Sequence, residues 1–173
     1  MISIEPISAN SETWDDVLEI FLDSSTQKTF ADQKEKNDFI YKYLSFYKEN
    51  HAEYFLVAKR LDEVIGYICG AKDSKSQTKL FELLPHYELF REEYIKYPAH
   101  LHINLSPKAR GAGVGSRLIN EFEKAVACST HLITTPSARN RKFYTKNFYT
   151  TEIIRTFSGS ELLFMGKAYK PNM

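Results

Sequence analysis

The chain has 173 residues, of which 43% are hydrophobic and 26% charged, and its net charge is +1. This length predicts a single domain (1–173) with its own core, and the near-neutral charge argues against a protein that binds nucleic acid non-specifically. The apolar runs are too short to span a membrane, and Cys69 and Cys128 lie far apart in the sequence. We therefore expect a reduced, cytoplasmic protein that has no bound metal and no membrane partner.

Residues 1–71 predict a strand, two helices and a hairpin, in that order. Polar and apolar residues alternate over residues 2–7, which indicates a short strand. The two helices, the second from about residue 32 to 48, carry apolar residues at helical spacing, namely Trp14, Val17, Leu18, Phe21 and Leu22, then Phe39, Ile40, Tyr43, Leu44 and Tyr47. Two β-rich runs at 53–60 and 64–71, separated by three residues, indicate the hairpin.

Residues 72–97 interrupt this regular pattern as an insertion, with a polar start and a predicted helix at 87–96. The elements predicted after it are a strand at 101–105, a helix at 113–127, a strand at 131–135, a helix at 138–146 and strands at 149–156 and 161–168. This order predicts an α/β fold with a mixed, mostly antiparallel sheet and helices on both faces.

The segment Arg110-Gly111-Ala112-Gly113-Val114-Gly115 holds three of the seven glycines and joins a predicted strand to a predicted helix. Such a turn leaves N–H groups unpaired at the helix N-terminus, where they can bind a phosphate. The residues after Gly115 are Ser116 and Arg117, which excludes a Gly-Lys-Ser/Thr nucleotide loop, and the glycines alternate instead of following Gly-x-Gly-x-x-Gly. A tight turn that lets the helix pack on the sheet is the alternative.

The Arg-x-x-Gly-x-Gly pattern of this loop resembles the pyrophosphate loop of the GNAT superfamily of N-acetyltransferases, and the order of the elements resembles that family too. The resemblance implies a GNAT-like fold with a splayed pair of central strands, and acetyl-CoA as the cosubstrate. The coenzyme would contact Ile103, Leu105, Arg110, Gly111, Ala112, Gly113, Val114, Gly115 and Ser116. A backbone N–H near Leu105 would stabilise the oxyanion that forms from the thioester carbonyl.

Residues 137–149 resemble a second family pattern, Asn, then Ala, then Phe-Tyr-x-Lys-x-Gly-Phe, in the helix beside the coenzyme's thiol. The matching residues are Phe143, Tyr144, Lys146 and the final aromatic Tyr149, whereas Ser137, Asn140 and Phe148 replace the family's Asn, Ala and Gly. The resemblance places Asn140 among the coenzyme contacts and makes Tyr144 the general acid that protonates the leaving thiolate. Taken alone, a Phe-Tyr pair on a helix indicates core packing.

The attacking amine must lose a proton, and the strand before the loop offers candidate bases. His100, His102 and Asn104 alternate on one strand face, and histidine titrates near neutral pH. We predict His102 as the base because it lies nearer the loop; a hydrogen-bonded core histidine, a water path or a carboxylate from residues 72–97 are the alternatives. Residues 99–102 resemble arylalkylamine N-acetyltransferases. Residues 97–103 resemble more closely bacterial acetyltransferases related to the acetyltransferase-like domain of O-GlcNAc hydrolases.

These patterns predict an acetyl-CoA-dependent N-acetyltransferase that acts on a primary amine by direct attack in a ternary complex. The acceptor would be a small molecule or a peptide. A catalytically silent acyl-CoA-binding module of the same fold is the main alternative, and transfer of another acyl chain is a third. The aromatic and acidic residues of 72–97 leave open whether this insertion binds the acceptor or contacts a second copy in a homodimer.

Overall fold

The computed structural model describes residues 1–8 and 11–171. Its strands follow the hydrogen-bonding order β1-β2-β3-β4-β5-β7-β6. The β4–β5 pair is parallel, and the pairs β1–β2, β2–β3, β5–β7 and β6–β7 are antiparallel. This confirms the expected α/β fold with a mixed sheet. The chain divides into unit 1 (Met1–Gly70 and His102–Ala125) and unit 2 (Ala71–Leu101 and Val126–Met173), and strand β4 contributes residues to both.

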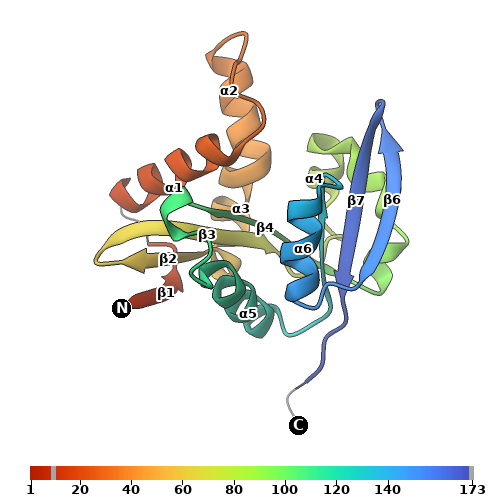
Figure 1. Cartoon of the computed structure of the whole chain (residues 1–173). Helices are drawn as coiled ribbons and strands as arrows, with labels where there is room; N and C mark the ends of the chain where they lie inside the picture. The colour runs from red at the N-terminus through yellow and green to blue at the C-terminus, as the bar shows by residue number, and fades with distance from the viewer. Residues whose placement is uncertain (9–10, 172–173) are drawn as a thin grey trace. The chain divides into compact units, whose positions relative to one another are not determined.

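Unit 1 holds the N-terminal strands and the helix that follows the glycine loop. Its elements are β1 (Ile2–Pro6), α1 (Ser11–Ser24), α2 (Gln33–Ile40), α3 (Phe46–Asn50), β2 (Leu56–Arg60), β3 (Glu63–Ala71), the second part of β4 (Ala99–Leu105) and α5 (Val114–Val126). Figure 1 shows α1 and α5 on opposite sides of β2 and β3. Ring contacts fix both helices, because Trp14 meets Phe55 at 6.4 Å and Tyr54 meets Phe122 at 6.4 Å. The apolar stripe of α5 is buried, as its spacing predicts.

Strands β3 and β4 approach closely at Gly66. A Cβ on this glycine would lie 2.5 Å from Leu105 Cδ2 and 3.1 Å from the Asn104 carbonyl oxygen. Any larger residue would therefore require the Leu105 side chain to move and would crowd the Asn104 carbonyl oxygen. Glycine at this position thus allows the end of β4, which leads to the glycine loop at residues 110–115, to lie close to β3.

The helix predicted at 32–48 is present but contains an irregular turn. Helix α2 begins after Asp32, whose side chain accepts a hydrogen bond from the Glu35 N–H at 2.8 Å. Residues Tyr41–Ser45 then form a π-helical turn before α3 continues to Asn50. Such turns insert one residue into a helix and often occur at functional sites.

Unit 2 is built on the C-terminal strands. Its elements are α4 (Thr78–Leu83), the first part of β4, β5 (Thr130–Thr134), α6 (Ala138–Lys146), β6 (Thr151–Phe157) and β7 (Ser160–Lys167). Figure 1 shows β6 and β7 as a long antiparallel hairpin, with Phe157 paired to Ser160 at its turn. The parallel ladder between β4 and β5 joins Ala99 to Thr130 and His100 to His131. Both strands continue beyond these pairs, which is the short pairing expected of a splayed strand pair.

The helix predicted at Tyr87–Lys96 is wrong, since two 3₁₀ turns, Pro85–Phe90 and Glu93–Ile95, occupy this segment. Their N–H groups bond three residues back, as from Arg91 to Glu88 at 3.3 Å. Residues three apart lie on one side of a 3₁₀ helix. The buried aromatic residues Tyr87, Phe90, Tyr94 and Tyr97 are spaced by three, four and three, which suits an α-helix equally well, so the spacing in the sequence could not reveal the 3₁₀ turns.

The insertion packs its aromatic residues into the core of unit 2. Phe90 stacks on Phe164 of β7 at 5.4 Å, and Tyr94 stacks on His131 of β5 at 4.7 Å. Arg155 of β6 binds Glu93 at 2.6 Å and donates to the Leu89 carbonyl oxygen. The segment is therefore part of the packed core of unit 2.

Candidate functional site

The glycine loop of unit 1 is exposed and has left-handed backbone at two glycines. Gly111 has φ +81° and Gly113 has φ +76°. An ideal Cβ at either position would meet nothing within 4 Å in the part of the chain that the structure describes. These glycines are required by the backbone and not by helix packing, which counts against the tight-packing alternative for them. The loop surface is open at both positions.

Helix α5 begins at Val114, immediately after this loop, and is 13 residues long. Its first N–H groups have no partner within the helix, and the helix dipole adds partial positive charge at this end. Arg117 N–H bonds the Gly113 carbonyl oxygen at 3.1 Å, which closes the first helical turn. The loop and the start of α5 thus have the geometry from which helix N-termini bind anions.

The basic residues near the loop differ in what their side chains contact. Lys108 Nζ lies 3.2 Å from Glu63, and Arg117 donates to the Ile2 carbonyl oxygen at 3.0 Å. Arg110 is exposed on the loop itself. The Arg110 side chain is thus the basic group that the loop itself presents to solvent.

His102 and Asn104 each contact a buried tyrosine of unit 1. His102 Nε2 lies 3.0 Å from the phenol oxygen of Tyr47, and its ring meets the ring of Tyr43 edge to face at 6.2 Å. Asn104 Nδ2 donates to the Tyr67 phenol oxygen at 2.7 Å. His102 is half-buried. It is thus held by the helical segment 41–50 without being fully buried.

His100, two residues earlier on β4, is enclosed in unit 2. It is buried, and its Nδ1 lies 2.7 Å from the hydroxyl of Ser74, which also bonds the Pro98 carbonyl oxygen at 2.7 Å. The Tyr87 ring packs edge-on against it at 5.6 Å. These contacts tie the start of the insertion to β4 and favour the hydrogen-bonded core role for His100.

Tyr144 lies in α6, and the C-terminal cap of this helix fixes its position. The Tyr149 N–H bonds the Tyr144 carbonyl oxygen at 3.1 Å, and the Phe148 N–H bonds that of Thr145 at 3.0 Å. These two bonds form a Schellman motif, which places a left-handed residue, usually glycine, just after the helix. Phe148 occupies that position with φ +69°. The family's glycine at this place is thereby explained by backbone conformation.

The rings of Tyr144 and Tyr149 make the apolar contact that commonly accompanies this motif, at 6.0 Å. The Tyr149 hydroxyl is bonded to Thr130 at 2.8 Å, which links the cap to β5. Burial raises the pKa of the Tyr144 phenol above its ordinary value, so the phenol keeps its proton at neutral pH.

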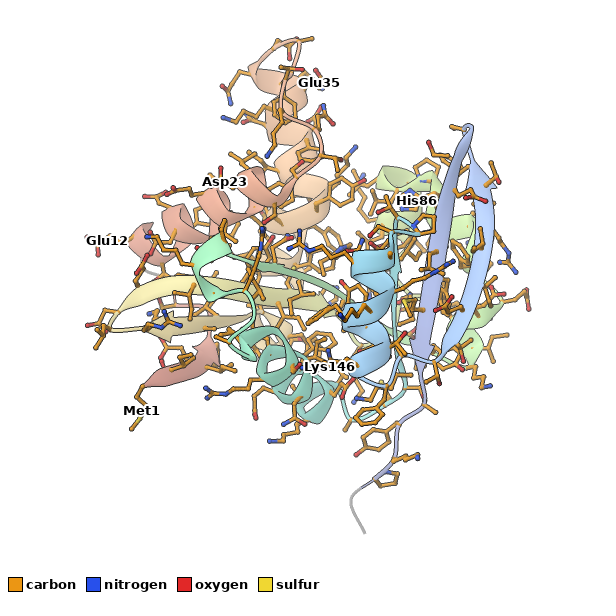
Figure 2. All side chains as sticks on the ribbon, viewed as in Figure 1. Met1, Glu12, Asp23, Glu35, His86 and Lys146 are labelled. Carbon is orange, nitrogen blue, oxygen red and sulfur yellow. The ribbon has the colours of Figure 1, made fainter. Side chains whose placement is uncertain are left out.

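The N-terminus of α6 explains two of the departures from the family pattern. The Ser137 hydroxyl accepts a hydrogen bond from the Asn140 N–H at 3.1 Å and so caps the helix. The Asn140 side-chain amide donates to Thr134 at 2.8 Å and thereby joins the helix to the end of β5. Lys146, labelled in Figure 2, is the last residue of α6.

The predicted site residues fall into two groups. Unit 1 brings together His102, Ile103, Leu105 and residues 110–116, and unit 2 holds Tyr144 with Asn140 on α6. Sequence reasoning did not identify Tyr47, because its place on the apolar stripe of the second predicted helix indicated only core packing. Its partner on β4 is 55 residues away.

Two further findings concern the described residues alone. No group of three or more His, Cys, Asp or Glu side chains within 1–8 and 11–171 is arranged to hold a metal ion. Across the same residues, no helix combines the length and the apolar composition that a membrane span requires.

Comparison with known proteins gives the family. Residues 14–148 match the Acetyltransferase (GNAT) family. The chain is similar to the crystal structure of SsHAT, at 18% identity and TM-score 0.75, with 96% of this chain and 98% of that one covered. It is also similar to a PaiA N-acetyltransferase from Thermoplasma acidophilum in complex with coenzyme A, at 18% identity and TM-score 0.61, covering 98% and 99%. A ribosomal-protein-alanine N-acetyltransferase from Brucella melitensis has 17% identity and TM-score 0.60, covering 96% and 99%. At such identities the structures show the fold, whereas the family match spans most of the chain: this protein belongs to the GNAT family of acetyltransferases.

Proposed function

We propose that the protein transfers an acetyl group from acetyl-CoA to a primary amine by direct attack within a ternary complex. The observation that carries the proposal is the loop of unit 1, where Gly111 and Gly113 have left-handed backbone and open space at the start of α5. A pyrophosphate bound on the N–H groups of residues 110–116 would use this geometry. Ile103, Leu105 and Asn140 would contact the remainder of the coenzyme.

The reaction needs three groups from the protein. The amine nitrogen forms a bond to the thioester carbon while the carbon–sulfur bond breaks. The Leu105 N–H stabilises the negative charge on the carbonyl oxygen, His102 takes the amine proton, and Tyr144 supplies a proton to the leaving thiolate. Tyr144 then regains its proton from solvent.

The raised pKa of Tyr144 determines how its proton is used. A phenol with a raised pKa is a weaker acid than a thiol, whose ordinary pKa is about 8.5. We expect Tyr144 to donate a hydrogen bond to the sulfur first and to release its proton late, once charge has developed on the sulfur. The same shift keeps the phenol protonated over the whole working range of His102.

The acceptor and the subgroup belong to the same proposal. We infer a small-molecule or peptide amine as acceptor, and cytoplasmic action, from the family and the sequence. The likeness of residues 97–103 to bacterial relatives of the acetyltransferase-like domain of O-GlcNAc hydrolases is part of this proposal as well. In that stretch His100 is hydrogen-bonded to Ser74, which supports His102 over His100 as the base.

A screen of amines and peptides with acetyl-CoA tests the proposal, with calorimetry of coenzyme A run in parallel. We expect turnover whose pH profile has an acidic limb that is flattened in His102→Gln and partly recovered at alkaline pH, where free amine accumulates. His100→Gln serves as the matched variant, and its acidic limb should follow that of the parent. Coenzyme binding without turnover on any acceptor would favour the silent binding module, and absence of binding would overturn both readings.

A further inference from the structure

A polar contact between His102 and the helical segment 41–50 involves a fully buried tyrosine. Tyr47 has 0% exposure, and its phenol oxygen lies 3.0 Å from His102 Nε2. The two rings are 5.2 Å apart and tilted by 56°. Tyr47 lies on α3, directly after the π-helical turn that carries Tyr43. The imidazole is therefore positioned by a side chain that is itself fixed in the core of unit 1.

If His102 acts as a base, its protonation cycle indicates whether His102 Nε2 or the Tyr47 phenol donates the hydrogen bond between them. A histidine that gains a proton carries N–H on both ring nitrogens. A phenol that donated to Nε2 would have to reverse its hydrogen bond at every proton transfer. A phenol oxygen that accepts from Nε2–H keeps the same bond in the neutral and the charged ring. An accepting oxygen therefore suits a base better than a donating one.

We propose that Tyr47 is the positioning residue of His102: its phenol oxygen accepts a hydrogen bond from Nε2–H, fixes the ring and directs the amine proton to Nδ1. This role rests on the proposed function of His102 as the base. Tyr47 itself touches neither the acceptor nor the coenzyme in this scheme. It selects the tautomer through which His102 acts.

The groups around this pair include other titrating and charged side chains. Tyr43 faces the His102 ring, Lys42 lies over the Tyr43 ring at 5.3 Å, and His51 packs beside Tyr47 at 6.4 Å. Burial raises the pKa of Tyr43, so that phenol stays neutral near pH 7. Because His51 is a second imidazole beside Tyr47, its contribution must be removed separately.

The effect of removing the Tyr47 oxygen on the pKa of His102 and on kcat/KM can be estimated. A net hydrogen bond changes an equilibrium by about 2- to 10-fold, and a bond to a charged group is roughly twice as strong as a neutral one. Removing the acceptor therefore destabilises the protonated form of His102 more than the neutral form. We expect Tyr47→Phe to lower the pKa of His102 by about 0.4 to 1 unit and kcat/KM by about 2- to 10-fold.

Nitrogen NMR of the full-length protein labelled in histidine, without acyl-CoA, tests the pair directly. In the parent we expect His102 protonated at Nε2 and unprotonated at Nδ1, a result that needs no variant. In Tyr47→Phe the Nδ1–H tautomer should increase and the pKa should fall. Tyr67→Phe is the matched control, because it deletes a buried phenol that binds Asn104, and His51→Gln removes the neighbouring titration.

An Nδ1–H tautomer in the parent, or the same tautomer ratio and pKa in the parent and Tyr47→Phe, would overturn the proposal. The acidic limb of kcat/KM gives the second readout, and it should move to lower pH by the same amount as the NMR titration. If the NMR titration moves but the kinetic limb does not, His102 is not the base and the catalytic role of Tyr47 is wrong. Coenzyme binding at the loop, measured by calorimetry, would be unaffected by that result.

Discussion

Gly113→Asp is the most direct test of the loop as a pyrophosphate site. The backbone at residue 113 has φ +76°, and Asp adopts this region more readily than most residues. A Cβ there has open space within 4 Å of the described chain. The substitution therefore leaves the fold intact, at a cost of about 1 kcal/mol, and places a carboxylate on the surface where the pyrophosphate would lie.

The expected loss of binding can be estimated from the charges. A carboxylate about 4 Å from one phosphate charge is repelled by about 4 kcal/mol at an effective dielectric constant of 20. Each charge-assisted hydrogen bond that the side chain displaces would add about 1.5–3 kcal/mol. We therefore expect the Kd for coenzyme A to rise by about 10³-fold or more. Gly113→Asn has a similar shape without the charge and should weaken binding less.

Calorimetry of coenzyme A against the parent and three variants measures this prediction. Gly159→Asp is the matched control, because Gly159 has φ +80° and equally open space at the β6–β7 turn. Both aspartate variants should lose similar amounts of stability, while only Gly113→Asp should lose affinity. A Kd for Gly113→Asp equal to that of the parent would refute the placement of the pyrophosphate.

Three further predictions concern three tyrosines and the cap of α6. Tyr144→Phe should lower kcat by about 10²–10⁴-fold with an unchanged Kd for coenzyme A, and an equal rate under chemistry-limited conditions would exclude Tyr144 from the mechanism. Phe148→Gly should raise the free energy of unfolding in urea by about 1 kcal/mol, because it relieves the left-handed backbone at φ +69°, and a decrease would contradict that account. Burial raises the pKa of Tyr67 and Tyr94, so above about pH 10 the unfolded chain loses phenol protons that the folded chain keeps. Stability should then fall by up to about 1.4 kcal/mol per pH unit for each phenol, and a flat profile between about pH 9 and 11 would disprove it.

Much of the fold follows from local patterns in the sequence. The apolar stripe of α5 predicted this helix to within a few residues, since the helix buries one face, and both final strands were placed equally closely. The loop at 110–115 could also be predicted, because left-handed backbone at Gly111 and Gly113 restricts the residue type. In these places the structure of a segment can be predicted from the residues of that segment alone.

Other features depend on partners that are distant in the sequence. The contact of Tyr47 with His102 joins residues 55 positions apart, so the helical stripe alone indicates only burial. The segment 87–96 has helical composition, but aromatic packing on β5 and β7 selects 3₁₀ turns. The Schellman cap of α6 could not be predicted either, because its left-handed position is occupied by Phe148, and this position is usually a glycine.

The division of the chain has a consequence for its synthesis. Unit 1 joins Met1–Gly70 to His102–Ala125, so its N-terminal strands must wait until residues 71–125 have been made before α5 can cover them. During synthesis on the ribosome, β1 to β3 would therefore lack the cover of α5 while the insertion at residues 72–97 is made. Premature termination before residue 125 would therefore leave an exposed sheet face, a species that chaperones and proteases remove.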